Sequence, residues 1–376
     1  MNTVRPAAAI LLSVGLVVTG CSGDEPGPTT LDSGDDYRVV DALGELPVSA
    51  LEDEGAIILT GDLRTATDVG GLARPSDPAD EAVREWLTDL MGGPGPAGEI
   101  SVFVPIPEGL TPGTAQVGDA DDLYGWSVLD VDSFAAVSSP PDDFTVVSGA
   151  FDQGTLDADL KEVQDGILTD RDGQDHEIDL SFASPLSRAG APTRLARQND
   201  RIAFSSSTPA VSTWLEGAES AAEVEALSSV ARALDRDNVY SAVLTTSVPE
   251  GAGPSGDRAS LDSTAQVREE TGGTLPGEPF DVVGLGWGHH DGAPVVLSAY
   301  HFASDTAAEG AVDSLRDLYS SGSTAASSQP FGDYFTVEGV RVEGSVVVVS
   351  TRPATDAPVA LLYQALHARD DLFTSR

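Results

Sequence analysis

The chain has 376 residues and a formal net charge of −41, from 61 acidic and 20 basic residues. This excess of negative charge repels phosphate backbones, so nucleic-acid binding is not expected. Cys21 is the only cysteine. An intramolecular disulfide and a metal site built from several cysteines are therefore excluded.

The N-terminus has the pattern of a lipoprotein signal peptide. Arg5 precedes an apolar run from Ala7 to Val18, which is long enough for a signal-peptide core and too short to span a bilayer. The run ends in the sequence Val-Thr-Gly-Cys, in which small residues precede the nucleophilic thiol of Cys21. We expect residues 1–20 to be a signal peptide cleaved between Gly20 and Cys21, and Cys21 to carry a diacylglyceryl group. An ordinary secretory signal with an incidental cysteine is the alternative.

This pattern predicts an extracytoplasmic protein, anchored by lipid to the outer face of the cell membrane. The acidic surface would be repelled by anionic headgroups, so membrane attachment is expected to come from acyl chains on Cys21. Residues 21–36 are rich in Gly, Pro, Ser, Thr and acidic residues and are expected to form a disordered tether.

A folded N-terminal region is expected over 37–250. It should begin with a short helix that ends by Pro47, followed by a strand over 56–60. A helix capped by Asp77 is expected next, because Val83, Trp86, Leu87, Leu90 and Met91 form one apolar stripe. The apolar alternation over 100–106 predicts a strand.

The interval 121–217 has an order of elements that recurs over 280–376. In the first interval we expect a turn of helix and then a strand over 126–137, a strand over 144–151, a helix over 156–163, a hairpin over 195–204 and a helix beginning at Thr208. A helix with the capping box Ser220 and Glu223, and a strand over 238–248, should follow. Residues 251–279 are expected to be an exposed loop or linker.

The second interval is expected to contain strands over 280–287 and 294–302, a helix over 308–319, a hairpin over 340–350 and a helix over 359–366. Both intervals thus have the order strand, strand, helix, hairpin, helix. The sequence therefore predicts an α+β fold of two related units, each a mostly antiparallel sheet backed by helices, arising from internal duplication. Chance similarity of two α+β stretches is the alternative.

The lipobox, the stretch Tyr124-Gly-Trp-Ser-Val-Leu-Asp-Val-Asp132 and the order of the repeated units resemble a family of uncharacterised cell-surface lipoproteins of actinobacteria. The resemblance implies a lipid-anchored location and repeated α+β units after an acidic tether. It implies no activity for any residue of this chain.

Histidines near a predicted hairpin are a weak candidate for a metal site. If Asp291-Gly292 forms a two-residue turn, His290 pairs with Ala293 and His289 with Pro294. The two histidines then point to opposite faces, and His301 lies roughly 23 Å farther along the ladder. Polar hairpin residues are therefore the favoured interpretation, and no cofactor is expected.

Two further candidates are also weak. Asp170, Asp172 and Asp175 only partly match a calcium-binding loop, so a solvated turn is favoured. Trp287 lies in the sequence Gly-Leu-Gly-Trp-Gly, which lacks the spacing and the following helix of a dinucleotide site. A ligand-stacking role for Trp287 is possible, but core packing is favoured.

These observations predict a non-enzymatic binding or scaffolding lipoprotein at the cell envelope. Its expected partners are membrane lipid, through the acylated Cys21, and a component of the cell wall or an envelope protein. A secreted hydrolase that uses a pair of acidic residues on envelope glycan or peptide is the alternative.

Overall fold

The computed structural model describes residues 31–373 except for 52–55, 79–80, 94–100, 112–113, 139–142, 152–153, 157–159, 183, 188–189, 247–275, 325–328, 356 and 369. The predicted signal peptide, its cleavage site, Cys21 and most of the predicted tether and linker lie outside the described residues. Among the helices that are described, none has both the length and the apolar character needed to cross a bilayer.

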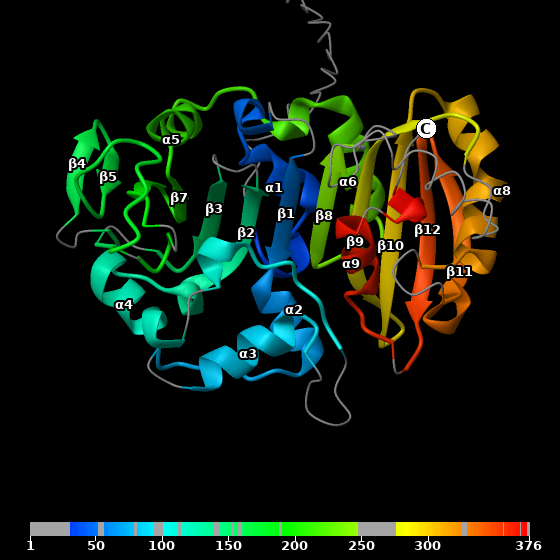
Figure 1. Ribbon diagram of the computed structural model, residues 1–376, viewed down its shortest axis with the longest axis horizontal. Helices are drawn as coiled ribbons and strands as arrows, with labels where there is room; N and C mark the ends of the chain where they lie inside the picture. Colours follow the sequence, from blue (N-terminus) through cyan, green and yellow to red (C-terminus); the bar gives the residue numbers. More distant parts are fainter. Residues whose placement is uncertain are drawn as a thin grey trace, which may run out of the picture.

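The described strands form one antiparallel, twelve-stranded sheet (Figure 1). Their order is β11-β12-β10-β9-β8-β1-β2-β3-β7-β6-β5-β4. The strands are β1 (Ile57–Asp62), β2 (Val131–Ser138), β3 (Phe144–Gly149), β4 (Lys161–Gln164), β5 (Ile167–Thr169), β6 (Arg194–Gln198), β7 (Arg201–Ser205), β8 (Ser241–Thr246), β9 (Phe280–His290), β10 (Ala293–Phe302), β11 (Phe335–Glu343) and β12 (Val346–Pro353).

Helices cover both faces of this sheet, and each face has its own hydrophobic core. One core contains apolar residues from α2 (Leu63–Gly70), α3 (Ala82–Leu90), α4 (Thr114–Tyr124), α8 (Asp305–Ser321) and α9 (Leu361–His367). The other contains apolar residues from α1 (Val39–Gly44), α5 (Thr208–Leu215) and α6 (Glu225–Asp235). The central strands are consequently buried on both sides, as in a three-layer arrangement.

The α+β class is confirmed, but the two halves share one sheet where we expected a sheet in each unit. They join where β8 pairs with β1, and from this pair the strand order outward is the same on each side: β1-β2-β3-β7-β6 and β8-β9-β10-β12-β11. The helices do not follow this pattern, because α5 and α9 pack into cores on opposite faces. The shared strand order does not show a duplication, which stays a prediction.

Two of the predicted elements are wrong. Where a helix was expected over 156–163, the chain forms the β4–β5 hairpin, with Gly166 in the left-handed region at φ +75°. Asp165-Gly166 is a hairpin-turn sequence, and its preference overrides the helical spacing of the leucines before it. Residues 101–107 form no strand, because this segment packs across helices instead, and the Val104 amide donates to the Leu90 carbonyl at 2.7 Å.

Other elements were missed or shifted. α2 and α4 were not expected, and α3 starts at Ala82 with Glu81 at its N-cap, later than the expected start after Asp77. The capping box of Ser220 and Glu223 forms, but on a single 3₁₀ turn that precedes α6.

A buried carboxylate fastens α1 to the first half of the sheet. Glu45 follows α1 and is only 3% exposed. One of its oxygens accepts a hydrogen bond from Arg201 on β7, and the other accepts from the Trp214 indole on α5 at 3.0 Å. A single side chain therefore links α1, β7 and α5.

We predict that Glu45→Ala lowers the free energy of unfolding by about 3–5 kcal/mol, because it leaves the Arg201 charge and the Trp214 donor buried without their partner. Urea denaturation followed by tryptophan fluorescence measures the change. Glu225→Ala, at an exposed position in the first turn of α6, is the control and should change stability by less than about 0.5 kcal/mol. Equal denaturation midpoints for both variants would contradict this role of Glu45.

Candidate functional site

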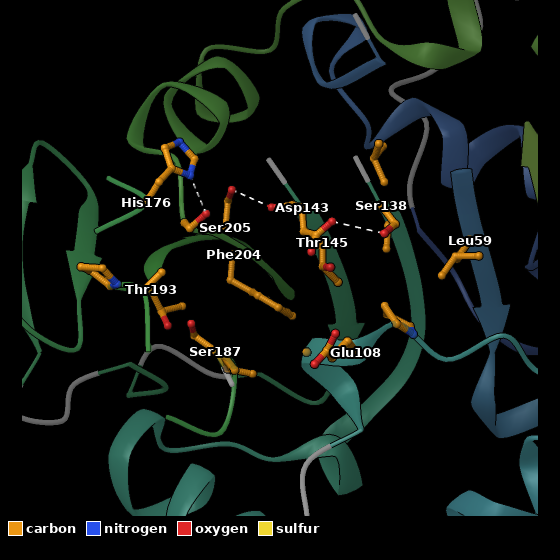
Figure 2. A pocket seen from close by; sticks show the side chains of 18 of the residues that line it. Leu59, Glu108, Ser138, Asp143, Thr145, His176, Ser187, Thr193, Phe204 and Ser205 are labelled. Carbon is orange, nitrogen blue, oxygen red and sulfur yellow. Dashed lines mark hydrogen bonds between the residues drawn. The ribbon is translucent and has the colours of Figure 1, made fainter. Parts of the chain in front are cut away.

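A pocket of about 470 Å³ lies at one end of the first half of the sheet (Figure 2). One wall consists of residues of β1, β2, β3 and β7, and a second is the turn at residues 107–109. The third is formed by residues 176, 178, 186–187 and 191–193 of the β5–β6 connection. Its apolar lining is Leu59, Pro107, Ala136, Val137, Ile178, Leu186, Ala191, Pro192 and Phe204. This volume and composition are typical of pockets that bind small molecules.

Polar groups follow one another along one rim of this pocket in Figure 2. His176 Nδ1 lies 3.0 Å from Ser206 Oγ, within hydrogen-bond distance. The neighbouring Ser205 hydroxyl donates to the Asp143 carbonyl at 2.7 Å, and the Asp143 carboxylate accepts from Ser138 at 3.2 Å. Glu108 brings a second carboxylate to the lining, from the turn at 107–109.

The loop that carries His176 is held by a nearly buried arginine. Arg194, 3% exposed, donates to the Asp175 carboxylate at 2.8 Å, to the Thr169 hydroxyl at 2.7 Å and to the Gly173 carbonyl at 2.8 Å. Asp175 in turn accepts from the Thr208 amide at 2.8 Å, at the start of α5. The residue before His176 is thus attached to the helix that begins just after Ser206.

The electrostatics of Asp175 agree with this structural role. Burial alone would raise the pKa of its carboxyl, but hydrogen bonds from Thr208 and from Arg194, together with the arginine charge, lower it below its ordinary value. Asp175 is therefore ionised at neutral pH and holds both donors.

The turn at 107–109 approaches the sheet closely. A Cβ atom on Gly109 would lie 2.8 Å from the ring of Phe204, too close for any real contact. Glycine is needed here so that the turn can pack against Phe204, the aromatic side chain in the centre of the pocket in Figure 2.

The structure does not bring the predicted histidines together. The hairpin register is the expected one, with His290 opposite Ala293, His289 opposite Pro294 and His301 opposite Val282. His290 is exposed, and the His301 ring is 2.6 Å from the Asp281 carboxylate. Among the described residues, no three or more His, Cys, Asp or Glu side chains are placed to hold a metal ion.

The three aspartates of the possible calcium loop each face a different protein donor. The Asp170 carboxylate accepts from the Tyr124 hydroxyl at 2.9 Å and from the Thr193 amide at 3.0 Å. Asp172 forms an exposed ion pair with Lys161 at 2.7 Å. Asp175 has the partners described above, so the three carboxylates do not converge.

Trp287 is fully buried in the core beneath α9, and its indole donates to the Val359 carbonyl at 3.0 Å. The neighbouring glycines face the opposite core. A Cβ atom would lie 2.5 Å from Val230 at Gly284, and 2.9 Å from Val239 at Gly286. These glycines let β9 approach α6 and the segment after it closely.

None of the polar residues that line the pocket was among the candidates predicted from the sequence. His176 and Ser206 are 30 residues apart and form no recognised motif. One signal was available: Ser205-Ser206-Ser207 separates a strand from a helix, and side chains at such a turn often face a site. Nothing in the sequence indicated that His176 would lie beside it.

Comparisons with known proteins give no family: no family model and no curated protein matches the chain. Two solved structures, titled as crystal forms III and I of TP0453, match with TM-scores of 0.35 and 0.34 at 8% sequence identity. The alignments cover 85% and 86% of this chain and 98% and 97% of those chains. At these TM-scores the likeness carries no argument about fold or function.

His289 gives a prediction about acid stability. It stacks on Tyr240, with ring centroids 5.8 Å apart, and neither ring nitrogen has a hydrogen-bond partner among the described residues. Burial lowers the pKa of His289 to about 4. The unfolded chain, with an ordinary histidine pKa of about 6.5, therefore takes up a proton more readily between these pH values.

The stability that neutral His289 contributes is thus present above about pH 6.5 and is lost as the pH falls toward 4. We predict that His289→Phe loses less stability than the wild type between pH 7 and pH 4.5, measured as the unfolding midpoint in urea. His290→Phe, at the exposed neighbouring position, should keep the wild-type dependence. If the urea midpoints of His289→Phe and of the wild type fell equally with pH, buried neutral His289 would not be the cause of the acid sensitivity.

Proposed function

We propose that this protein is a lipid-anchored binding protein of the cell envelope, which takes a small, mainly apolar ligand that is neutral or cationic into the pocket described above. One observation carries the proposal: the pocket has a mainly apolar lining that includes two carboxylates, those of Glu108 and Asp143. None of the described residues that line it is Lys or Arg.

The charge of the lining selects against anionic ligands. Two like charges about 4 Å apart repel by roughly 1 kcal/mol in water and about 4 kcal/mol at an effective dielectric constant of 20. A carboxylate or phosphate bound next to Glu108 or Asp143 would meet this repulsion. A neutral ligand avoids the cost, and an amine would be attracted, as it would be by the net charge of −41.

One residue of the pocket lining belongs to an exposed apolar segment. Ile178 lines the pocket and is 65% exposed, and Leu180 and Phe182, on the same segment, are 81% and 39% exposed. Large apolar side chains that gather on a surface segment often indicate a binding site. An apolar ligand could therefore contact this segment before it enters the pocket.

We predict that decylamine binds more tightly than decanoate, which has the same chain length and the opposite charge. With a difference of about 1–4 kcal/mol, the dissociation constants should differ by roughly fivefold to several hundredfold. Isothermal titration calorimetry on the full chain measures both. Equal affinities, or tighter binding of decanoate, would contradict the proposed ligand class.

Ile178→Asp should abolish binding of neutral decanol, because it replaces an apolar lining residue with a charged one. Val163→Asp is the matched control, because Val163 is an exposed valine on β4 that does not line the pocket. It should bind decanol as the wild type does.

The proposed location rests on the signal-peptide pattern that ends at Cys21, which lies outside the described residues. We predict that a Cys21→Ser variant appears in the soluble fraction, whereas the wild type sediments with membranes, because serine offers no thiol for the diacylglyceryl group. Immunoblotting of fractionated cells measures the distribution. A variant that stays with the membrane fraction would count against lipid anchoring. We also propose that a component of the cell envelope binds the acidic surface, because the expected location of the protein is the cell envelope.

A further inference from the structure

Ser206 and His176 form a pair that has the geometry of a nucleophile and its base. Ser206 Oγ and His176 Nδ1 are 3.0 Å apart, and both residues line the pocket. A histidine at this distance can accept the serine proton and so activate the hydroxyl for attack on a carbonyl carbon. The pair is independent of the two-acid hydrolase that the sequence left as an alternative.

The backbone around His176 is held in an unfavourable conformation. His176 has φ +60°, in the left-handed region that few residues other than glycine adopt. Residues in this region persist only where the surrounding structure holds them, and they often lie at functional sites. Here the holding contacts are those of Asp175, which is fixed by Arg194 and by the Thr208 amide.

Ser206 lies at a turn between a strand and a helix. β7 ends at Ser205, and α5 begins at Thr208. The amides in the first turn of a helix point back along its axis and favour negative charge. The Thr208 amide is bonded to Asp175 and Pro209 has no N–H, which leaves the Ala210 amide in this first turn.

From these observations we propose that the pocket hydrolyses carboxylic esters, with Ser206 as the nucleophile and His176 as the general base. This inference rests on the proposed function for the pocket and the ligand class. The substrate is an ester of an apolar carboxylic acid with a neutral or cationic alcohol, and water is the second reactant.

In the first step the Ser206 proton moves to His176 Nδ1 while Oγ forms a bond to the ester carbonyl carbon. The tetrahedral intermediate then breaks its bond to the alcohol oxygen, which takes the proton from His176. A water molecule next gives a proton to His176 and attacks the acyl group on Ser206. When the bond to Oγ breaks, the proton returns to Ser206 and the carboxylic acid is released.

The acidic residues of the lining also affect release of the carboxylate product. A neutral ester meets no repulsion from Glu108 or Asp143, whereas the carboxylate that forms on hydrolysis does. The same charges that disfavour anionic ligands therefore favour release of the acid.

The test uses the full chain in detergent and two probes, a fluorophosphonate that reacts with activated serines and p-nitrophenyl butyrate. We expect labelling at Ser206, located by mass spectrometry of peptides, and release of p-nitrophenol. Ser206→Ala should abolish both. His176→Gln should slow both by about 10²–10⁴-fold, the usual contribution of a general base.

Ser212→Ala is the matched control, because Ser212 lies on α5 outside the pocket and bonds Gln164 instead. It should react like the wild type. Urea midpoints of all variants establish that each is folded. Reaction that persists in Ser206→Ala, or labelling at another serine, would overturn the assignment.

Decylamine binding, measured on the same wild-type preparation, separates this inference from the proposed function. Binding without labelling or hydrolysis would overturn the esterase and leave the binding protein standing. Loss of both would overturn both.

Discussion

The pairing of β1 with its two neighbours is the constraint on which the rest of the structure depends. β1 pairs with β2 on one side and with β8 on the other, so this single strand joins both halves in one sheet. Its backbone leaves no room for a larger residue at Gly61, where a Cβ atom would lie 2.7 Å from Val104 and 2.8 Å from the Phe134 ring. Because helices cover both faces here, each backbone donor and acceptor of β1 depends on these ladders.

The position of the pocket depends on where neighbouring strands of the sheet end. β2 and β7 end, and β3 begins, beside the β5–β6 connection, which contributes residues to the same pocket. Such a connection has no regular hydrogen bonding of its own, and its polar groups need other partners. Arg194 provides several of them from one buried position, and this explains how an irregular segment can hold His176 in a defined place.

Local signals in the sequence predicted much of the fold but not the candidate site. The Asp291-Gly292 turn fixed the register of β9 and β10, and every predicted histidine pairing was confirmed. The apolar spacing over 156–163 favours a helix. The turn sequence Asp165-Gly166 after it favours a hairpin instead, and the hairpin forms. The pairing of β1 with β8 could not be foreseen, since no property of either strand specifies a partner so distant in sequence. His176 and Ser206 escaped notice for the same reason: their proximity depends on tertiary contacts of Arg194 and Asp175.

The scarcity of basic residues connects the fold to the proposed chemistry. Several of the 20 are used inside the molecule: Arg194 and Arg201 are largely buried and neutralise Asp175 and Glu45. Charges this deep are paired because an isolated buried ion is too costly. Acidic residues outnumber basic ones about threefold, so the chain carries a large net negative charge. Salt screens their long-range field beyond about 8 Å at physiological ionic strength. The proposed selection among ligands therefore depends on charges within the pocket, whose lining includes Glu108 and Asp143.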